Sequence, residues 1–484
     1  MDRAPPEQLL QLLRDCDLEI FQHLWESGSG YQTIVHVAKK VEDILKHPED
    51  SLIVMSGCGT SGRLAYLLAI SFNRLLKGLK KQQVFAYTIA GGDKALLTSQ
   101  EAPEDSPQLG ALNLEQVCAG KRRILFIGIS CGLSAPYVAG QLDFCMNHLN
   151  VFTPVLIGFN PVNMARNESI PDWSLTFRSV TERMEQMQKT NRAFILNPAV
   201  GPEPISGSSR MKAGSATKIL LETLLWAAHT STLSHTHTTH SHVLKLLRKY
   251  EQVHTNTYNQ SVHIAALVKQ AGTRGRHDFT DNLDAVEDLA HCVKPKTSSL
   301  HAVTHAFGPN SVPDKIKDAF ASVMTIAWPR TSEEDSPFLL TLQAELSTKW
   351  VLNAISTGAH ILKGKIYRNY MVDLKVTNSK LFRRAVTLLQ LLSGCAAERC
   401  HGALIQAIYS TDEPTEEMNT ASLTERAHIA NTSSKVVPTA LLMLRWSCSV
   451  CEARARLQGH MIIRDAVEAC LTASTCTRTA HATT

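Results

Sequence analysis

Three short segments of the sequence combine glycines with hydroxyl side chains, and each leads into a helix-like stretch. The first, Gly57–Arg63 (GCGTSGR), directly follows the strand-like run Ser51–Ser56. The first amides of a helix lack partners within the helix, and the helix dipole favours negative charge beside them. Gly59 lets the backbone approach a ligand closely, while Thr60 and Ser61 add hydroxyl donors. These residues therefore form a candidate phosphate-binding loop.

The same segment formally matches the G-x-G-x-x-G pattern of dinucleotide-binding turns. That pattern also requires an acid at the end of the second strand to hold a ribose. Here the run Val84–Ala90 leads into Gly91 and Gly92 before Asp93, so the expected acid is missing. Two adjacent hydroxyls suit a phosphate monoester better than a dinucleotide. A dinucleotide site and a tight turn without a ligand remain the alternatives.

Two further segments have a similar composition. Ser130–Pro136 (SCGLSAP) follows the apolar run Ile124–Ile129, which places Ser130 at the carboxyl end of a strand. Open α/β sheets bind their ligands at this edge. Ser206–Ser215 (SGSSRMKAGS) brings hydroxyls, glycines and two cations to the start of a helix. For this third segment the alternative is a capped helix start with solvated charges.

Other residues with potential chemistry have a simpler structural interpretation. Glu104 lies in an acidic loop that, taken alone, reads as surface, although a carboxylate beside a sugar can accept hydroxyl hydrogen bonds or act as a general acid or base. The histidines of the 230–242 segment have no acidic or cysteine partner within it, which favours a solvated linker over a metal site. Cys448 and Cys451 form a single CxxC, which is typical of a helical turn when no second pair is near.

The pattern of apolar runs predicts an α/β protein. Residues 1–48 are expected to form helices, and within residues 49–229 short apolar strands alternate with helices, which indicates a parallel sheet covered on both faces. Residues 243–344 are expected to form a smaller α/β unit, with helices at Val243–Ala271 and Asn282–Val293 and one strand at Ala319–Trp328. Residues 345–473 are expected to be helical, and the polar residues 474–484 to form a frayed tail. The five predicted strands of the sheet are Ser51–Ser56, Val84–Ala90, Arg123–Ser130, Val155–Phe159 and Ala193–Leu196.

The composition limits the classes of function. A chain of 484 residues is too long for one compact core. A net charge of +5 without a basic block does not indicate nucleic-acid binding. The 12 cysteines are scattered, as reduced thiols are in an intracellular protein. The sequence shows neither a signal-peptide core nor an apolar run of about 18 residues, so we expect a soluble protein without a membrane span.

Taken together, these motifs resemble the sugar isomerase (SIS) domain, in the branch that includes bacterial N-acetylmuramic acid 6-phosphate etherase. A still closer resemblance is to the glucokinase regulatory protein family, and it extends from about Asp17 to about Ala469. The segments similar to the SIS branch and its helical tail are Gly57–Arg63, Ile89–Asp93, Glu104–Ser106, Gly128–Pro136, Ser206–Lys218, Lys365–Leu374 and Asn378–Leu381. Those similar to the closer family are Ser71–Asn73, Lys77–Leu79, Gly158–Val162 and Glu345–Trp350.

This resemblance implies two SIS domains and a helical cap, with fructose 6-phosphate and fructose 1-phosphate competing for one pocket. In the family the fructose 6-phosphate form binds and inhibits glucokinase and holds it in the nucleus, and fructose 1-phosphate releases it. A non-catalytic regulator of nucleus and cytoplasm, without cofactor or metal, is therefore implied. The implied sugar-phosphate contacts are Gly59, Thr60, Ser61, Glu104, Ser130, Cys131, Gly132, Ser208, Ser209 and Lys349. The implied glucokinase contacts are Asn150, Val151, Ser299, Leu300 and His301.

The chain departs from the family pattern in its second half. Gly272–Asp278 runs almost at once into what resembles the late part of the second SIS domain, so about half of that domain is predicted to be missing, including an acidic residue of the pocket. A parallel sheet without its interior strands exposes apolar edges and unpaired backbone groups. Two further hypotheses therefore stay open. One is an enzyme, either an etherase-type lyase that uses Glu104 or a sugar-phosphate isomerase. The other is a degenerate chain in which only the first SIS domain folds.

Overall fold

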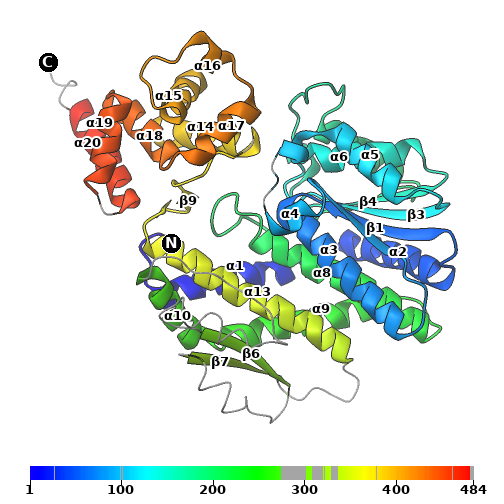
Figure 1. Cartoon of the computed structure of the whole chain (residues 1–484). Helices are drawn as coiled ribbons and strands as arrows, with labels where there is room; N and C mark the ends of the chain where they lie inside the picture. The colour runs from blue at the N-terminus through cyan, green and yellow to red at the C-terminus, as the bar shows by residue number, and fades with distance from the viewer. Residues whose placement is uncertain are drawn as a thin grey trace.

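The computed structural model describes residues 1–26, 28–98, 100, 102–273, 301–307, 320, 322–328, 336–377, 379–460 and 462–479. Two helices open the chain, α1 (Pro6–Glu26) and α2 (Gly28–Lys46), as their apolar periodicity predicts. A parallel sheet of five strands follows, which confirms the predicted α/β class (Figure 1). Its strands are β1 (Ser51–Gly57), β2 (Phe85–Ile89), β3 (Arg123–Ile129), β4 (Phe152–Ile157) and β5 (Phe194–Leu196).

The strand order β2-β1-β3-β4-β5 sets the place of a ligand. β1 and β3 are neighbours in the sheet with Gly57 opposite Ile129, but the chain leaves them in opposite directions along the sheet. Such a switch in strand order opens a crevice at the carboxyl ends of the strands. The connecting helices are α3 (Gly59–Gly78), α4 (Lys94–Leu97), η1 (Ala102–Asp105), α5 (Pro107–Val117), α6 (Pro136–Asn147), η2 (Val162–Met164), α7 (Phe177–Gln188) and α8 (Lys212–Leu233).

Both faces of the sheet are buried. Val54 and Phe126 pack under α5, α6 and α7, whereas Met55 and Ile127, the next residue along each strand, pack against α2, α3 and α8. Side chains alternate between the faces of a strand, so continuous apolar strands are required when helices cover both sides. Each fully buried side chain of this kind contributes about 1.5–3 kcal/mol.

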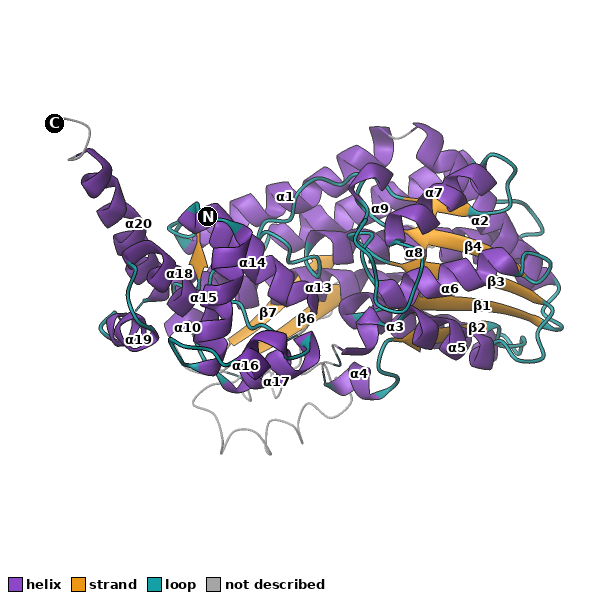
Figure 2. Ribbon diagram, turned by 90° about the horizontal axis from the view of Figure 1, so that it is seen from above, coloured by secondary structure: helices purple, strands orange, loops and turns teal. Residues whose placement is uncertain are grey.

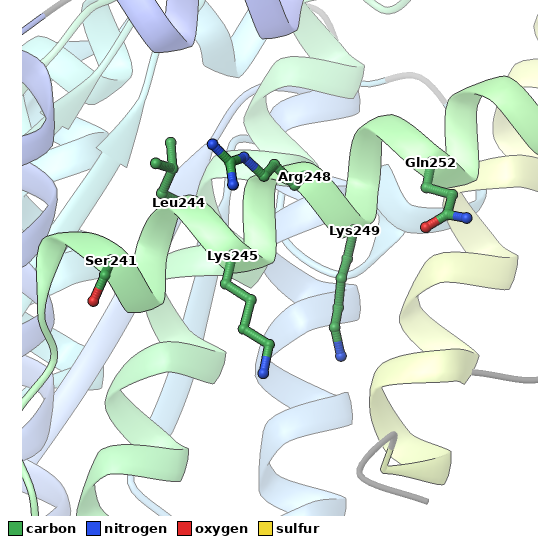
Figure 3. Close-up of a pocket in the computed structure, with 6 residues that line it drawn as sticks. All are labelled: Ser241, Leu244, Lys245, Arg248, Lys249 and Gln252. Atoms are coloured by element: carbon green, nitrogen blue, oxygen red, sulfur yellow. The ribbon is translucent and has the colours of Figure 1, made fainter. Parts of the chain in front are cut away.

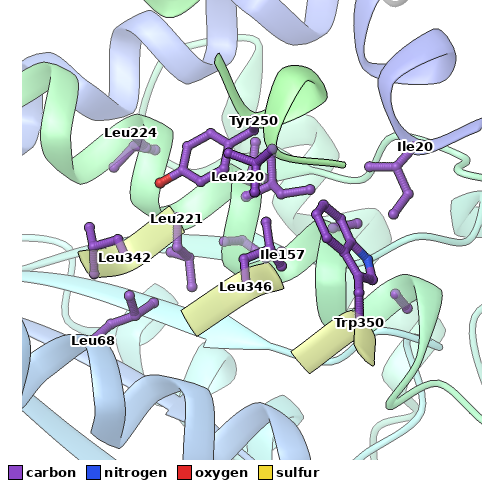
Figure 4. Packing of buried hydrophobic residues seen from close by; sticks show 14 of the residues in the cluster. Ile20, Leu68, Ile157, Leu220, Leu221, Leu224, Tyr250, Leu342, Leu346 and Trp350 are labelled. Carbon is purple, nitrogen blue, oxygen red and sulfur yellow. The ribbon is translucent and has the colours of Figure 1, made fainter. Parts of the chain in front are cut away.

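The helix α8 joins the sheet to a second helical layer. It is buried along almost its whole length and packs on α1, α2, α9 (His240–Tyr258) and α13 (Pro337–Leu362), while α10 (Ser261–Thr273) packs on α13. Figure 4 shows Leu221 of α8, Tyr250 of α9 and Leu346 and Trp350 of α13 in this core. Since α13 is continuous, the predicted boundary between residues 344 and 345 falls inside a helix that packs with the preceding part of the chain.

The Ser/Thr/His segment 230–242 is more structured than a solvated linker. Its first residues complete α8 and its last residues begin α9, which leaves Ser234–Thr239 as the connection. The buried carboxylate of Glu42 accepts a hydrogen bond from the amide of Thr238 at 2.8 Å and lies 3.0 Å from His237 Nδ1. An acid from α2 therefore fixes this turn, and no local sequence pattern could have indicated that contact.

The second α/β unit contains two parallel strands among the described residues. β7 (Ser322–Trp328) lies within the predicted strand Ala319–Trp328, whereas β6 (His301–Phe307) was not predicted. The pair packs on α9 and α13 through Met324, Ile326 and Trp328. The predicted helix Asn282–Val293 lies outside the described residues.

After a short hairpin of β8 (Ile366–Tyr367) and β9 (Tyr370–Met371), the C-terminal part is helical as predicted, with an apolar core of its own. Figure 2 shows α19 (Val450–Gln458) and α20 (Ile463–Thr479) at the end of the molecule away from the five-stranded sheet. In the described part of the chain, no single helix is long and apolar enough to cross a membrane; only the bent pair of α18 (Val436–Trp446) and α19 passes by length and composition. The helices are α14 (Ser379–Ser393), α15 (Ala397–Tyr409), α16 (Glu416–Thr420), α17 (Leu423–Thr432), α18 (Val436–Trp446), α19 (Val450–Gln458) and α20 (Ile463–Thr479).

Candidate functional site

The first loop joins β1 to the start of α3. Cys58 caps the helix with an extended backbone, and its carbonyl accepts hydrogen bonds from the amides of Ser61 and Gly62. The amides of Gly59 and Thr60 make no hydrogen bond to any described residue. Gly59 has φ +50°, a conformation that costs other residues about 1 kcal/mol. The loop thus presents two unused amides at the positive end of a 20-residue helix.

The second loop lies at the end of β3, beside the first. The buried Ser130 hydroxyl accepts hydrogen bonds from the amides of Ser134 (3.1 Å) and Ala135 (3.3 Å). Its own hydrogen remains available for donation to a ligand. Gly132 is exposed, and its carbonyl accepts a hydrogen bond from Asn160 Nδ2 at 3.3 Å. This geometry supports the prediction of a donor-rich loop at the switch point.

Cys131 connects the two loops to the start of α8. Its Sγ lies 3.6 Å from Ser61 Oγ and 3.7 Å from Thr217 Oγ1. Burial raises the pKa of the Cys131 thiol, so the group is neutral and does not repel an anion. Three segments that are far apart in the sequence therefore meet at one thiol.

Glu104 lies beside the first loop. A Cβ placed on Gly59 would be 3.5 Å from Glu104 Oε1. The neighbouring Asp105 pairs with Arg166 at 3.8 Å, which anchors the short η1 helix. The acidic loop therefore lies next to the first loop of the candidate site.

The third segment surrounds the start of α8. The Glu203 carboxylate accepts hydrogen bonds from the amides of Lys212 and Ala213, both at 2.9 Å, and so caps the helix. Lys349 of α13 donates to Ser215 Oγ at 2.8 Å and to the carbonyl of Met211 at 3.1 Å. Lys349, one of the implied sugar-phosphate contacts, therefore reaches the start of α8 from more than 130 positions away in the sequence.

The surroundings of Lys349 shift the pKa of its ammonium group. Burial lowers the pKa of its ammonium group to about 8, although the charges of Asp17 and Glu203 oppose the change. Burial also raises the pKa of Asp17 to about 6, against the charge of Lys349, and Tyr258 donates a hydrogen bond to Asp17 at 2.9 Å.

The sequence analysis did not predict Asp17 or Glu203 as parts of this site. An acid shortly before a helix start could have indicated Glu203 as a cap, but no local pattern could have placed α1 behind α13.

Ser208 and Ser209 lie in the turn before α8. The carbonyl of Ser209 accepts a hydrogen bond from the amide of Gly214 at 2.9 Å, and that of Ser208 accepts one from Met211 at 3.0 Å. Their hydroxyls make no hydrogen bond within the described residues. Both side chains are therefore available as donors at the third loop.

The predicted partner contacts lie elsewhere. Asn150 is exposed and Val151 half-buried in the turn before β4, at the amino edge of the sheet and thus opposite the loops. His301 is the first residue of β6, with Nδ1 2.7 Å from Ser322 Oγ. Ser299 and Leu300 lie outside the described residues.

Neither of two surface hollows in the structure includes a predicted site residue. One, of about 340 Å³, lies along α9 beside Lys245, Arg248 and Lys249 (Figure 3). The other, of about 390 Å³, lies near the amino edge of the sheet beside Lys46 and Lys81. Among the described residues, no cluster of three His, Cys, Asp or Glu side chains could hold a metal ion.

A five-stranded parallel sheet with phosphate-type loops at its switch point defines this chain as a SIS-domain protein, and comparison with known families agrees. Residues 36–146 match the glucokinase regulatory protein N-terminal SIS domain. Residues 277–363 match the second SIS domain of that protein, and residues 368–467 match its C-terminal lid domain.

Relatives that align with almost the whole chain give the same result as the family models. The chain is 43% identical to the Xenopus laevis glucokinase regulatory protein over 562 residues, which covers 97% of this chain and 91% of the relative. Identity to the Homo sapiens glucokinase regulatory protein is 40% over 565 residues, with 97% and 90% coverage. The chain belongs to the glucokinase regulatory protein family. The frog alignment is longer than the 484-residue chain, so the relative has residues without a counterpart here, which agrees with the predicted shortening.

A more distant relative is the N-acetylmuramic acid 6-phosphate etherase of Clostridium botulinum. It is 29% identical over 241 residues, which covers 48% of this chain and 66% of the etherase. The resemblance to the etherase branch predicted from the loop motifs is therefore confirmed at lower identity.

Proposed function

We propose that this chain is a regulator of glucokinase that senses phosphorylated ketohexoses. Fructose 6-phosphate promotes inhibition of glucokinase, and fructose 1-phosphate relieves it. The first support is the name that relatives at 40–43% identity carry over almost the full chain. The second is the chemistry of the site, which offers amides, hydroxyls and one ammonium group to an anion.

The observation that carries the sugar-phosphate proposal is the convergence at Cys131. Ser61 of the first loop and Thr217 of α8 both approach its thiol, so the ends of β1 and β3 face the start of α8. The amides of Gly59 and Thr60, which make no hydrogen bond to the described residues, lie in the first of these loops. A phosphoryl group bound there receives several hydrogen bonds and a favourable helix dipole. Glu104, beside Gly59, accepts hydrogen bonds from the sugar hydroxyls.

A glucokinase inhibition assay tests the proposal. Glucokinase activity is measured with the purified chain at fixed concentration while each sugar phosphate is titrated. We expect inhibition to rise with fructose 6-phosphate and to fall when fructose 1-phosphate is added. Equal inhibition with both ligands, or with neither, contradicts the proposal. A Thr60→Val variant, which keeps the shape of the side chain and removes its hydroxyl, should respond to neither ligand at the concentrations that saturate the unmodified chain.

The glucokinase surface is proposed at Asn150, Val151 and His301, with Ser299 and Leu300 beside His301 in sequence. Because Val151 lies at the edge of the sheet opposite the loops, a Val151→Asp change should weaken glucokinase binding without altering sugar-phosphate affinity. Parallel calorimetric titrations with glucokinase and with fructose 6-phosphate separate the two effects. Loss of both affinities together argues against a separate partner surface.

Residence in nucleus and cytoplasm belongs to the same proposal. Imaging of the tagged chain with and without fructose tests it.

Etherase-type lyase chemistry is the second candidate, and the position of Glu104 favours it. A carboxylate beside a phosphate loop can act as a general acid or base on a bound sugar phosphate. Incubation with N-acetylmuramic acid 6-phosphate, followed by an assay for lactate, decides between the candidates. Lactate release that disappears in Glu104→Gln supports the enzyme, and its absence in both proteins supports the regulator.

A further inference from the structure

Two adjacent arginines of α14 connect the C-terminal helical domain to the loops of the candidate site. Arg384 Nη2 donates a hydrogen bond to the carbonyl of Gly207 at 2.7 Å, directly before Ser208 and Ser209. Arg383 pairs with Glu168 at 2.5 Å. Both contacts come from the first half of one helix, so α14 reaches two separate parts of the first domain.

The Arg384 contact constrains the residue that it meets. Gly207 has φ +72°, and a Cβ added there would overlap the guanidinium group. Among the described residues, no carboxylate lies within ion-pairing distance of Arg384, and burial lowers the pKa of its guanidinium. Its charge therefore acts on a carbonyl of the third loop instead of on an acid.

Glu168, the ion-pair partner of Arg383, is connected through Arg166 to the acidic loop and to the second loop. Glu168 also pairs with Arg166, at 3.5 Å, and Arg166 pairs with Asp105, next to Glu104, at 3.8 Å. Arg166 further donates from Nη1 to the carbonyl of Ser134 at 3.3 Å, in the second loop. One residue of α14 is thus linked to both the acidic loop and the second loop.

We propose that Arg383 and Arg384 are positioning residues of the sugar-phosphate site, which hold its loops only while α14 is docked. The inference rests on the proposed function, because it requires the loops to bind a phosphorylated sugar. Since coupling between two equilibria is reciprocal, a ligand that orders the loops must also favour the docked position of α14. Occupancy of the site is thereby transmitted to the C-terminal domain.

Calorimetry and hydrogen exchange test this coupling on the full chain. Arg384→Gln and Arg383→Gln should each bind fructose 6-phosphate about tenfold more weakly, the size of a typical coupling between sites. Arg384→Lys, which keeps the charge and one donor, should recover part of the loss. Arg399→Gln is the matched control, because Arg399 is an exposed arginine of the same domain that makes no hydrogen bond or ion pair to the described residues of the first domain.

The second readout separates positioning from a merely structural role. In the unmodified chain and in Arg399→Gln, fructose 6-phosphate should slow amide exchange in α14, whereas in Arg384→Gln exchange there should no longer depend on the ligand. Gly207→Ala should weaken binding by displacing the guanidinium, so its effect should be smaller in the Arg384→Gln background. Equal losses in both backgrounds contradict this explanation.

The outcomes distinguish the inference from the function on which it rests. If the unmodified chain binds neither fructose phosphate, the proposed function fails and the coupling fails with it. If the unmodified chain binds and the arginine variants bind equally well, with unchanged ligand-dependent exchange in α14, only the positioning role is overturned. Thermal unfolding of each variant, compared with Arg399→Gln, shows that any loss is measured on folded protein.

Discussion

The depressed pKa of Lys349 predicts that sugar-phosphate affinity falls when the pH rises above 8. In the ligand-free protein the pKa of this ammonium group is about 8, because burial penalises its charge. Its usual value is about 10.4. A phosphoryl dianion binds the charged form. Binding above pH 8 therefore has to take up a proton, whereas binding below pH 8 does not.

The size of the effect follows from the pKa. At pH 9 roughly one molecule in ten carries the charged Lys349, so the dissociation constant should be about tenfold higher than at pH 7, or about 1.4 kcal/mol. Asp17 and Cys131 keep the same charge over most of this interval, so their titration does not mimic the effect. Asp17 has a pKa of about 6 and is already ionised, and burial raises the pKa of the Cys131 thiol, which stays neutral. The second pKa of a phosphate monoester, about 6, also lies below it.

Calorimetric titration of fructose 6-phosphate at pH 7, 8 and 9 measures the effect. At pH 9 the observed heat should depend on the ionisation enthalpy of the buffer, with about one proton taken up per ligand. Lys349→Met should bind more weakly at pH 7 and show no further fall. Lys375→Met, which removes an exposed lysine that forms no hydrogen bond or ion pair within the described part of the chain, should behave like the unmodified chain. A dissociation constant that is the same at pH 7 and pH 9, or that rises equally in Lys349→Met, refutes the reasoning.

Further predictions concern the core and the first loop. Leu221→Ala should lower the free energy of unfolding in urea by about 2–5 kcal/mol, because it leaves a cavity in a fully buried cluster. Leu97→Ala is the control and should change stability little, because the Leu97 side chain is 89% exposed. Tyr250→Phe should cost about 1–3 kcal/mol, since it removes the 2.8 Å hydrogen bond to the buried carboxylate of Glu222, and unchanged urea unfolding contradicts this. Ser61→Ala should weaken fructose 6-phosphate binding about tenfold without lowering the thermal midpoint, and an equal loss of stability argues for a structural hydroxyl instead.

The sheet could be predicted from the sequence because its signals are local. Continuous apolar runs bounded by glycines and hydroxyls mark the strands, and each predicted strand has a counterpart within a few residues of its predicted bounds. The loops at Gly59–Ser61 and Ser130–Gly132 could be placed for the same reason, since a loop after a parallel strand must lie at the carboxyl edge. The strand β6 was not predicted, because His301, His305 and the small residues between them do not form an apolar run. The two-residue strands β8 and β9 were not predicted either, since the sequence analysis expected residues 345–473 to be helical.

The supporting charges could not be predicted, because they come from remote helices. Asp17 lies on α1 and Lys349 on α13, yet the charge of each acts on the other. Arg384 reaches Gly207 across 177 positions of sequence. Such contacts depend on how helices pack, and a helix of ordinary apolar periodicity can present its polar face to several different neighbours.

The shortened second domain still supplies the remote cation of the candidate site. The described part of that domain supplies two strands and the long helix α13, and α13 carries Lys349 to the start of α8. Since α13 packs directly on α8, α9 and α10, the position of Lys349 depends on helix packing and not on the completeness of a second sheet. The first domain supplies the amides and hydroxyls, α1 and the turn before α8 supply the opposing acids, and α14 holds the loops from outside. The groups proposed to hold a phosphoryl group therefore come from parts of the chain that the shortening of the second domain leaves in place.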